Sequence, residues 1–107
     1  MLTWDATSLR VRVVEPILAV MLTPEEARST RVEIRPGDEE GWLILRLTVG
    51  PADEFVSYLY QPPSMTGWSQ REIGQKLADE LHDFIAESAF GWGQTRDADE
   101  VLQSFEA

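Results

Sequence analysis

The sequence predicts an α+β fold in which a three-stranded antiparallel β-meander packs against one long C-terminal α-helix. Two observations lead to this prediction. Three short segments between residues 30 and 60 alternate apolar and polar side chains, which is typical of half-buried strands, and turn-forming residues separate them. Residues 69–90 then repeat apolar side chains every three or four positions, which is typical of an amphipathic helix. A fourth strand at the N-terminus remains an open alternative.

The predicted strands follow one another closely. Residues 31–35 alternate apolar and charged side chains, and Pro36-Gly37-Asp38 supplies turn chemistry after them. The second strand runs from Trp42 to Val49 and is followed by the turn Gly50–Asp53. The third, from Phe55 to Tyr60, is rich in aromatic and branched residues. Such short connections predict antiparallel neighbours, because parallel strands need a long crossover.

The long helix has end signals in the sequence. Ser69 is followed three residues later by Glu72, a capping box that satisfies two backbone donors at a helix start. Gly91 follows Phe90, the last apolar residue, where a left-handed position suits glycine. These signals predict a helix from Gln70 to Phe90. Its inward stripe, which must face the sheet, consists of Ile73, Leu77, Leu81, Phe84, Ile85 and Ser88.

The N-terminal stretch from Leu9 to Leu22 has two interpretations. Its first apolar residues alternate with arginines as in a strand. In a helix, however, Leu9, Val13, Ile17 and Val20 would lie on one side. Pro16 removes a backbone donor and disfavours an unbroken helix, so we favour a helical segment that is bent or interrupted there. A short second helix is expected at Thr23-Pro24-Glu25-Glu26, which combines a cap, a proline and an N3 carboxylate.

The chain is long enough for one domain with its own core, and no linker or repeat divides it. We expect a single α+β domain over residues 1–96 and an acidic C-terminal tail over residues 97–107. Asp97 and Glu100 have capping-box spacing. Val101, Leu102 and Phe105 would lie on one side of a helix formed there. So short a helix is stable only when it docks on other structure.

The charge balance limits the class of partner. Nine basic residues against nineteen acidic ones give the 107-residue chain a formal net charge of -10. A protein that binds nucleic acid or anionic lipid needs clustered lysine and arginine, so we expect neither partner. An acidic surface suits a basic protein partner instead.

Other features of the composition concern redox chemistry and location. The chain has no cysteine, which excludes disulfides and thiolate chemistry. Glu15 and Pro16 interrupt the apolar stretch Val11–Leu22, which is too short to span a membrane. Met1–Asp5 lacks the basic start of a signal peptide. We therefore expect a cytoplasmic protein with no membrane partner.

The predicted sheet has apolar side chains on its two faces. The long helix can cover the face built from Leu43, Leu45, Leu47 and Val49. The opposite face carries Trp42, Arg46, Tyr58 and Tyr60, whose residue types dominate the binding energy of protein interfaces. Exposing several aromatic side chains forgoes about 1.5–3 kcal/mol each. We expect either the N-terminal segment or a partner, including a second copy of the chain, to cover this face.

The polar side of the long helix offers two further candidates. Its acidic residues form a candidate surface for a basic partner: Glu72, Asp79, Glu80, Asp83 and Glu87. The only histidine, His82, lies beside Asp79 and Asp83, and this cluster suits a divalent cation or a general base. No second helix offers matching ligands, so a solvated acidic surface explains the cluster more simply.

No other group of residues points to catalysis. The serines lack a strand–turn–helix elbow, and no glycine-rich phosphate loop follows a strand. We therefore do not expect an enzyme, and we assign no cofactor and no catalytic residue. The leading hypothesis is a non-catalytic acidic protein-binding module, of inhibitor, immunity or accessory type, that binds a basic protein. The alternatives are a homodimeric subunit joined through the aromatic sheet face and a small metal-dependent enzyme that uses Asp79, His82 and Asp83.

Overall fold

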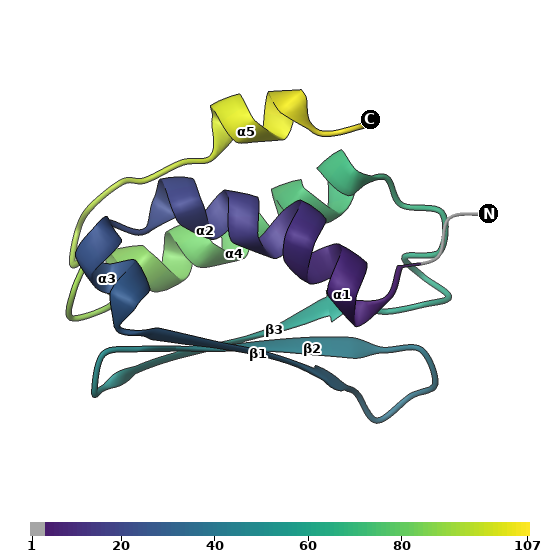
Figure 1. The fold of residues 1–107 in the computed structure, drawn as a ribbon, viewed down its shortest axis with the longest axis horizontal. Helices are drawn as coiled ribbons and strands as arrows, with labels where there is room; N and C mark the ends of the chain where they lie inside the picture. Colours follow the sequence, from purple (N-terminus) through teal and green to yellow (C-terminus); the bar gives the residue numbers. More distant parts are fainter. Residues whose placement is uncertain (1–3) are drawn as a thin grey trace.

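The computed structural model describes residues 4–107 and confirms the α+β class. The N-terminal residues Met1–Asp5, used above to argue against a signal peptide, fall mostly outside this range. Figure 1 shows a sheet with a layer of helices on one side only, and the C-terminal helix lies outermost over that layer. The polypeptide is therefore layered, with the sheet at one surface of the molecule.

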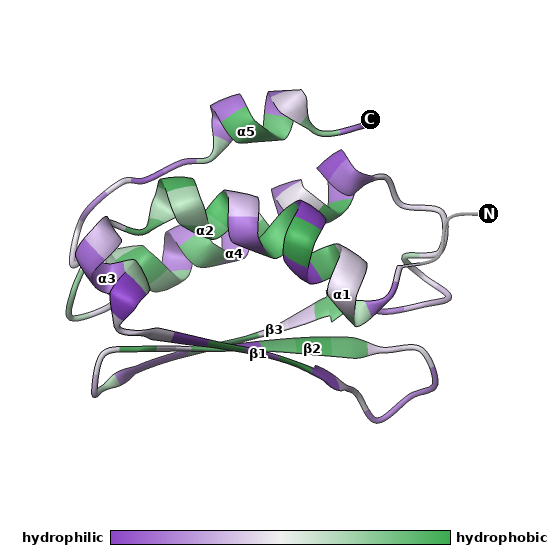
Figure 2. Cartoon of the chain, viewed as in Figure 1, coloured by the Kyte–Doolittle hydropathy of each residue, from purple (hydrophilic) through white to green (hydrophobic). Residues whose placement is uncertain are grey.

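The sheet is the predicted β-meander. Its strands are β1 (Thr30–Pro36), β2 (Leu43–Val49) and β3 (Asp53–Tyr60), in the spatial order β1-β2-β3 and antiparallel throughout. The central strand β2 is apolar along most of its length (green in Figure 2). The covered face buries Leu45, Leu47 and Val49, and Ile44 is apolar on the other face. Residues 4–107 contain no fourth strand.

The N-terminal segment is helical from Ala6 to Met21, and the expected interruption is a change in helix type. α1 (Ala6–Leu9) passes into a π-helical turn, η1 (Arg10–Val14), and then into α2 (Glu15–Met21). Pro16 has no N–H, and its ring crowds the carbonyl four residues earlier, that of Arg12. The π turn widens the helix at this point, and the Arg12 carbonyl accepts a hydrogen bond from Gln70 Nε2 at 2.8 Å.

Two of the three sites with capping-box spacing form capping boxes. Thr23 and Glu26 cap α3 (Pro24–Arg28), and Ser69 and Glu72 cap α4 (Gln70–Glu87). At α4 the backbone N–H of Glu72 donates to Ser69 Oγ at 3.1 Å, and the Ser69 N–H donates to Glu72 Oε1 at 2.9 Å. Each bond satisfies a donor that has no partner within a helix.

The predicted C-terminus of the long helix is wrong, because α4 ends at Glu87 rather than Phe90. Ser88 is extended, and its hydroxyl donates to the Ile85 carbonyl at 2.8 Å and accepts the Gly91 N–H at 3.1 Å. Gly91 is not in the left-handed region. Glycine is required there for space, since a Cβ would lie 2.6 Å from Ile85 Cγ2.

We expect Ser69→Ala to lower the free energy of unfolding by about 1 kcal/mol, because the first turn of α4 loses its side-chain cap. Chemical denaturation of the two proteins measures the difference. Thr95→Ala, at an exposed loop position, is the matched control and should change stability by less than about 0.5 kcal/mol. Equal effects of the two substitutions would contradict the capping role of Ser69.

The C-terminal tail forms part of the core. α5 (Asp99–Ser104) begins two residues later than the predicted cap at Asp97, and its N-cap residue is Ala98. Ala98, Leu102 and Phe105 are buried in the same hydrophobic cluster as the sheet and helices. The Arg71 guanidinium of α4 donates to three tail carbonyls, those of Leu102, Gln103 and Phe105, at 3.0–3.1 Å. The tail is thus bound at its end by α4.

Candidate functional site

One face of the sheet has no covering element among residues 4–107. All helices lie on the other side of the sheet (Figure 1), so the expectation that the N-terminal segment covers the second face is wrong. That segment packs beside α4 instead, because its apolar side chains Leu9, Val13 and Ile17 complete the same core. We call the uncovered surface the open sheet face. It consists of Arg31, Glu33, Arg35, Trp42, Ile44, Arg46, Thr48, Glu54, Val56 and Tyr58.

The apolar part of the open sheet face lies toward the β1–β2 hairpin. Tyr58 is 47% exposed and Val56 is 55% exposed, although both are large apolar or aromatic side chains within the paired length of the edge strand β3. The Trp42 and Tyr58 rings pack edge to face with centroids 5.7 Å apart. The indole of Trp42 is fixed by donating to the Pro62 carbonyl at 2.8 Å. A shallow hollow of about 320 Å³ lies beside Ile44 and Val56.

Tyr60 does not belong to this face and is only 3% exposed. The pairing of β2 with β3 shifts between Leu43, which pairs with Tyr60, and Ile44, which pairs with Tyr58. Leu59 is therefore an extra residue in β3. An extra residue reverses the side on which the following side chains point. The simple alternation that placed Tyr60 beside Tyr58 fails at this bulge, and Tyr60 lies in the core.

The charged residues of the open sheet face are partly paired within the chain. Arg46 donates to Glu54 Oε2 at 2.9 Å, and this hydrogen bond raises the pKa of Arg46. Arg35 forms an ion pair with Glu33. Arg31 forms no ion pair with any other residue in the range 4–107. The face is therefore close to neutral, although the whole chain is strongly acidic.

The acidic residues predicted on the long helix separate into two groups. Four of them, which we call the acidic stripe, are exposed: Glu72, Asp79, Asp83 and Glu87. Within residues 4–107 none of the four is paired with a lysine or arginine. Glu80 turns toward β3, where it accepts a hydrogen bond from Ser57 and pairs with Lys76 Nζ at 3.1 Å. Glu80 thus contacts another element of the fold through its side chain, whereas Glu72 acts within its own helix as the capping residue of α4.

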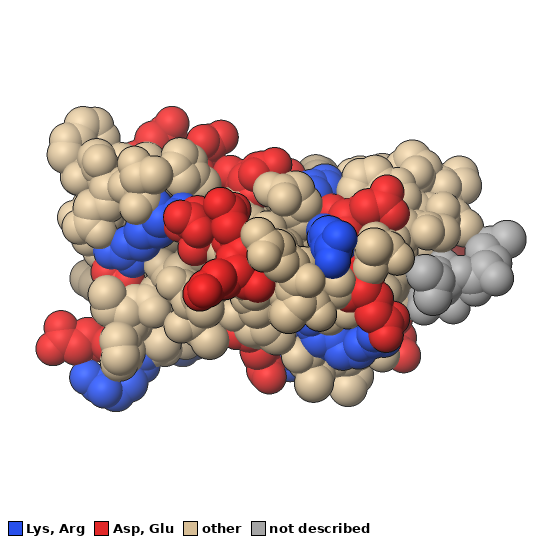
Figure 3. Space-filling view, turned by 90° about the horizontal axis from the view of Figure 1, so that it is seen from above, with Lys and Arg blue, Asp and Glu red and all other residues tan. Residues whose placement is uncertain are grey.

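Acidic side chains also continue beyond α4 onto the tail. Asp97, Asp99 and Glu100 are exposed at the start of α5. Figure 3, which views the molecule from the helix side, shows acidic groups spread across this surface with separate basic groups between them. The open sheet face and the helix side of the molecule therefore differ in charge.

The predicted metal cluster is not assembled. His82 Nδ1 lies 3.4 Å from Asp83 Oδ1, whereas Asp79 Oδ1 accepts a hydrogen bond from Gln75 Nε2 at 2.9 Å. In the described part of the chain, no three His, Cys, Asp or Glu side chains are grouped so that they could hold a metal ion. The hypothesis of a metal-dependent enzyme gains no geometric support from these residues.

Sequence reasoning missed Arg31, Glu33, Arg35 and Glu54 as members of the candidate surface. The pairing of the strands identifies them, because it places each of these side chains on the same face of the sheet as Arg46. Strand alternation was visible in the sequence, but the pairing that aligns the three strands was not.

Comparison of the chain with protein-family models, with curated proteins and with solved structures found no match. Among residues 4–107, no helix combines the length and apolar character needed to cross a membrane.

Proposed function

We propose that this protein is a non-catalytic acidic binding module that engages a basic protein through the acidic stripe on α4. An inhibitor, an immunity-type protein or an accessory subunit acts in this way, by occupying a cationic surface of its target. The observation that carries the proposal is the position of Asp83 and Glu87 in the last turns of α4, where helix physics disfavours acidic residues.

Two physical effects make this arrangement unfavourable for the helix alone. The C-terminal end of a helix carries partial negative charge, which repels a carboxylate by about 0.3–1 kcal/mol. Like charges four residues apart destabilise a helix by about 0.2–0.5 kcal/mol per pair, and Asp79, Asp83 and Glu87 form two such pairs. The last turn of α4 holds no basic residue to offset them. Local features that oppose stability are expected at functional sites.

The basic residues of the chain do not neutralise the stripe. Four arginines and the lysine pair with other acids: Arg12 with Glu106, Arg35 with Glu33, Arg46 with Glu54, Arg96 with Glu26, and Lys76 with Glu80. Arg71 is committed to the carbonyls of the tail. The stripe is therefore left for a positively charged surface outside the chain, where charge complementarity accelerates encounter and selects the partner.

The test compares two triple variants that remove the same number of charges. Asp79→Asn/Asp83→Asn/Glu87→Gln neutralises three of the four stripe residues and keeps Glu72, which caps α4. Asp38→Asn/Glu39→Gln/Glu40→Gln neutralises the exposed hairpin tip as the matched control. Each protein is immobilised and exposed to extract of its host at about 50 mM and about 500 mM salt. We expect a basic protein to bind wild type and the tip variant at low salt, and to be lost from the stripe variant and at high salt.

Stability measurements provide the second part of this test. The stripe variant should be more stable than wild type by about 0.5–1 kcal/mol, because it relieves the charge repulsion in α4. Capture of the same proteins by all three forms, or by none, would refute the proposed function. Purified partner and titration calorimetry then give the affinity of each form.

The bare open sheet face favours a second candidate, that of a homodimeric subunit. This candidate concerns a different surface, and the two functions are compatible because α4 and the open sheet face can be occupied at the same time. The charges of the open sheet face favour one orientation of a second copy on it.

A further inference from the structure

The side chains of the open sheet face form three rows that run across the strands. The strand register defines them: Arg31, Thr48 and Glu54 in the first row, Glu33, Arg46 and Val56 in the second, and Arg35, Ile44 and Tyr58 in the third. Trp42 extends the middle column beyond the third row. Each row therefore has one residue from β1, one from β2 and one from β3.

The two outer columns differ in charge. The β1 column carries two arginines, Arg31 and Arg35, and one acid, Glu33. The β3 column carries Glu54 and the uncharged Val56 and Tyr58. One edge of the face is thus net positive and the other net negative. A surface with this asymmetry is complementary to its own copy when the copy is turned so that opposite edges meet.

We propose that a second copy of this chain docks on the open sheet face, related by a two-fold axis that runs along β2. This rotation places β1 of one copy on β3 of the other. Arg31 then faces Glu54 of the second copy, and Arg35 faces the Tyr58 ring of the second copy, a cation–π pair. Because a two-fold interface is isologous, each contact occurs twice.

The unused bonding capacity of these residues fits the contact. Glu54 uses Oε2 for Arg46 and has its second carboxylate oxygen available. Arg31 has no ion-pair partner in its own copy within residues 4–107. On the axis itself, Ile44 meets its equivalent and buries the apolar centre of the face, which the Trp42 ring borders on the side of Tyr58. Arg46 faces its own equivalent across the axis in either face-to-face arrangement, and each guanidinium keeps its ion pair with Glu54 at 2.9 Å.

The other face-to-face arrangement is disfavoured by the same charges. A two-fold axis across the strands would place β1 on β1 of the second copy. Arg31 would then oppose Arg35 of that copy, and Glu33 would oppose its own equivalent. Like charges directly opposite each other repel, so the axis along β2 is the arrangement that the charges select.

The dimer is expected to be weak. Strands of seven to eight residues at about 3.3 Å per residue, with about 4.8 Å between strands, give a face smaller than a standard interface. Two chains of charge -10 also repel, although about 150 mM salt screens this beyond about 8 Å. We therefore expect a concentration-dependent dimer with a dissociation constant above about 1 µM.

Sedimentation analysis of a charge-swap set tests the contact between Arg31 and Glu54. All proteins in the set carry Arg46→Gln, because an arginine introduced at position 54 would otherwise contact Arg46 of the same copy. Arg31→Glu alone and Glu54→Arg alone should each raise the dissociation constant at least about tenfold, because each creates two repulsive contacts. The double variant should recover most of the loss. Glu25→Arg/Arg28→Glu, an exposed swap on α3, is the control and should leave dimerisation unchanged.

Cross-linking provides an independent readout, because the chain has no cysteine of its own. Thr48→Cys places a single thiol on the proposed axis, and a short bis-maleimide should join two such chains. Val20→Cys, on the helix side and 53% exposed, should not cross-link. Circular dichroism confirms that each variant is folded.

Two outcomes would overturn the proposal. One is a monomer at every concentration from about 10 µM to 1 mM. The other is a dimer that neither responds to the charge swap nor cross-links through Thr48→Cys. The stripe variants on α4 alter neither readout, so this proposal and the proposed function can fail separately.

Discussion

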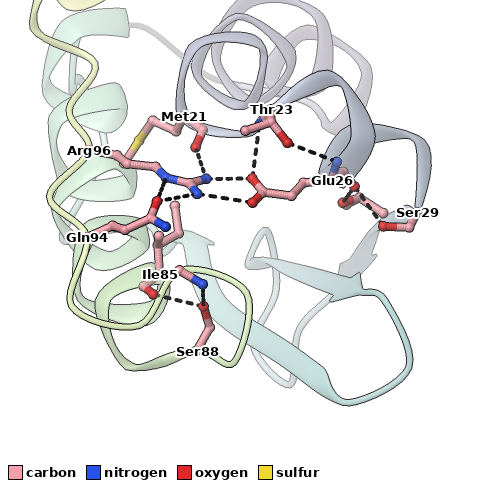
Figure 4. Close-up of polar contacts among 10 residues, drawn as sticks. Met21, Thr23, Glu26, Ser29, Ile85, Ser88, Gln94 and Arg96 are labelled. Carbon is pink, nitrogen blue, oxygen red and sulfur yellow. Dashed lines mark hydrogen bonds and ion pairs between the residues drawn. The ribbon is translucent and has the colours of Figure 1, made fainter.

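Replacing Arg96 with methionine is expected to lower the free energy of unfolding by about 3 kcal/mol, because it leaves Glu26 charged and unpaired in a mostly buried site. The two side chains are each only 15% exposed, and Arg96 Nη2 lies 3.0 Å from Glu26 Oε2. Arg96 also donates to the Met21 carbonyl at 3.0 Å, as Figure 4 shows. The pair joins the loop after α4 to the start of α3, two segments seventy residues apart.

The same pair makes a prediction about pH. Hydrogen bonds from Arg96 lower the pKa of Glu26 below its usual value of 4.5, and burial opposes this shift. A carboxyl whose folded pKa is depressed contributes stability that is complete above the unfolded pKa and is lost as the pH falls through the folded pKa. The stability gap between wild type and Arg96→Met should therefore be largest above pH 4.5 and shrink below it.

Urea unfolding at pH 7 and at several values below pH 4.5 measures this gap. Arg12→Met is the matched control, because its ion pair with Glu106 is exposed and contributes less than about 1 kcal/mol. If the two substitutions have equal effects at neutral pH, or if the gap for Arg96 does not change with acid, the assigned role of the buried pair is wrong.

Phe105→Ala is expected to lower the free energy of unfolding by about 3 kcal/mol, although position 105 is the third from the end of the sequence. Phe105 is 5% exposed and packs with Leu102 against α4. The loss of stability has an upper limit, because the tail of the variant can detach from α4 instead of leaving a cavity in the core. Ser104→Ala, exposed on the same helix, should change stability by less than about 0.5 kcal/mol.

Gly74 provides a further check on the docking of the tail. A Cβ at this position would lie 2.8 Å from Phe105 Cε2 and 2.9 Å from Leu102 Cδ2. Gly74→Ala should therefore destabilise wild type by about 1 kcal/mol, although alanine is normally better than glycine inside a helix by about 0.5–1 kcal/mol. In a Leu102→Ala/Phe105→Ala background, Gly74→Ala should instead raise the free energy of unfolding. The same sign in the two backgrounds would show that the tail does not contact Gly74.

Features that depend on neighbours in the sequence were predicted well. The two capping boxes at Thr23 and Ser69 each involve residues three apart, so their geometry is contained in a few residues. Strand alternation likewise identified β1, β2 and β3. The end of α4 was predicted wrongly because Ser88 and Gly91 respond to Ile85 and to the packing around it, which local signals do not describe.

The candidate surfaces were predicted only in part. The acidic stripe follows from helical spacing, so four of its five predicted residues lie exposed together. Glu80 does not belong to the stripe, because its carboxylate accepts a hydrogen bond from Ser57 of β3. Tyr60 does not lie beside Trp42 and Tyr58, because a single extra residue in β3 turns its side chain to the opposite face of the sheet.

The amino-acid order was sufficient for the fold class, the strands, the helix starts and the excess of negative charge, because these depend on composition and on residues a few positions apart. Which face of the sheet stays bare depended on long-range packing. The N-terminal helix joined α4 on one side, since its apolar stripe completes a single shared core there. That choice left Val56 and Tyr58 exposed and Trp42 and Ile44 only partly buried, and no local pattern could have revealed it.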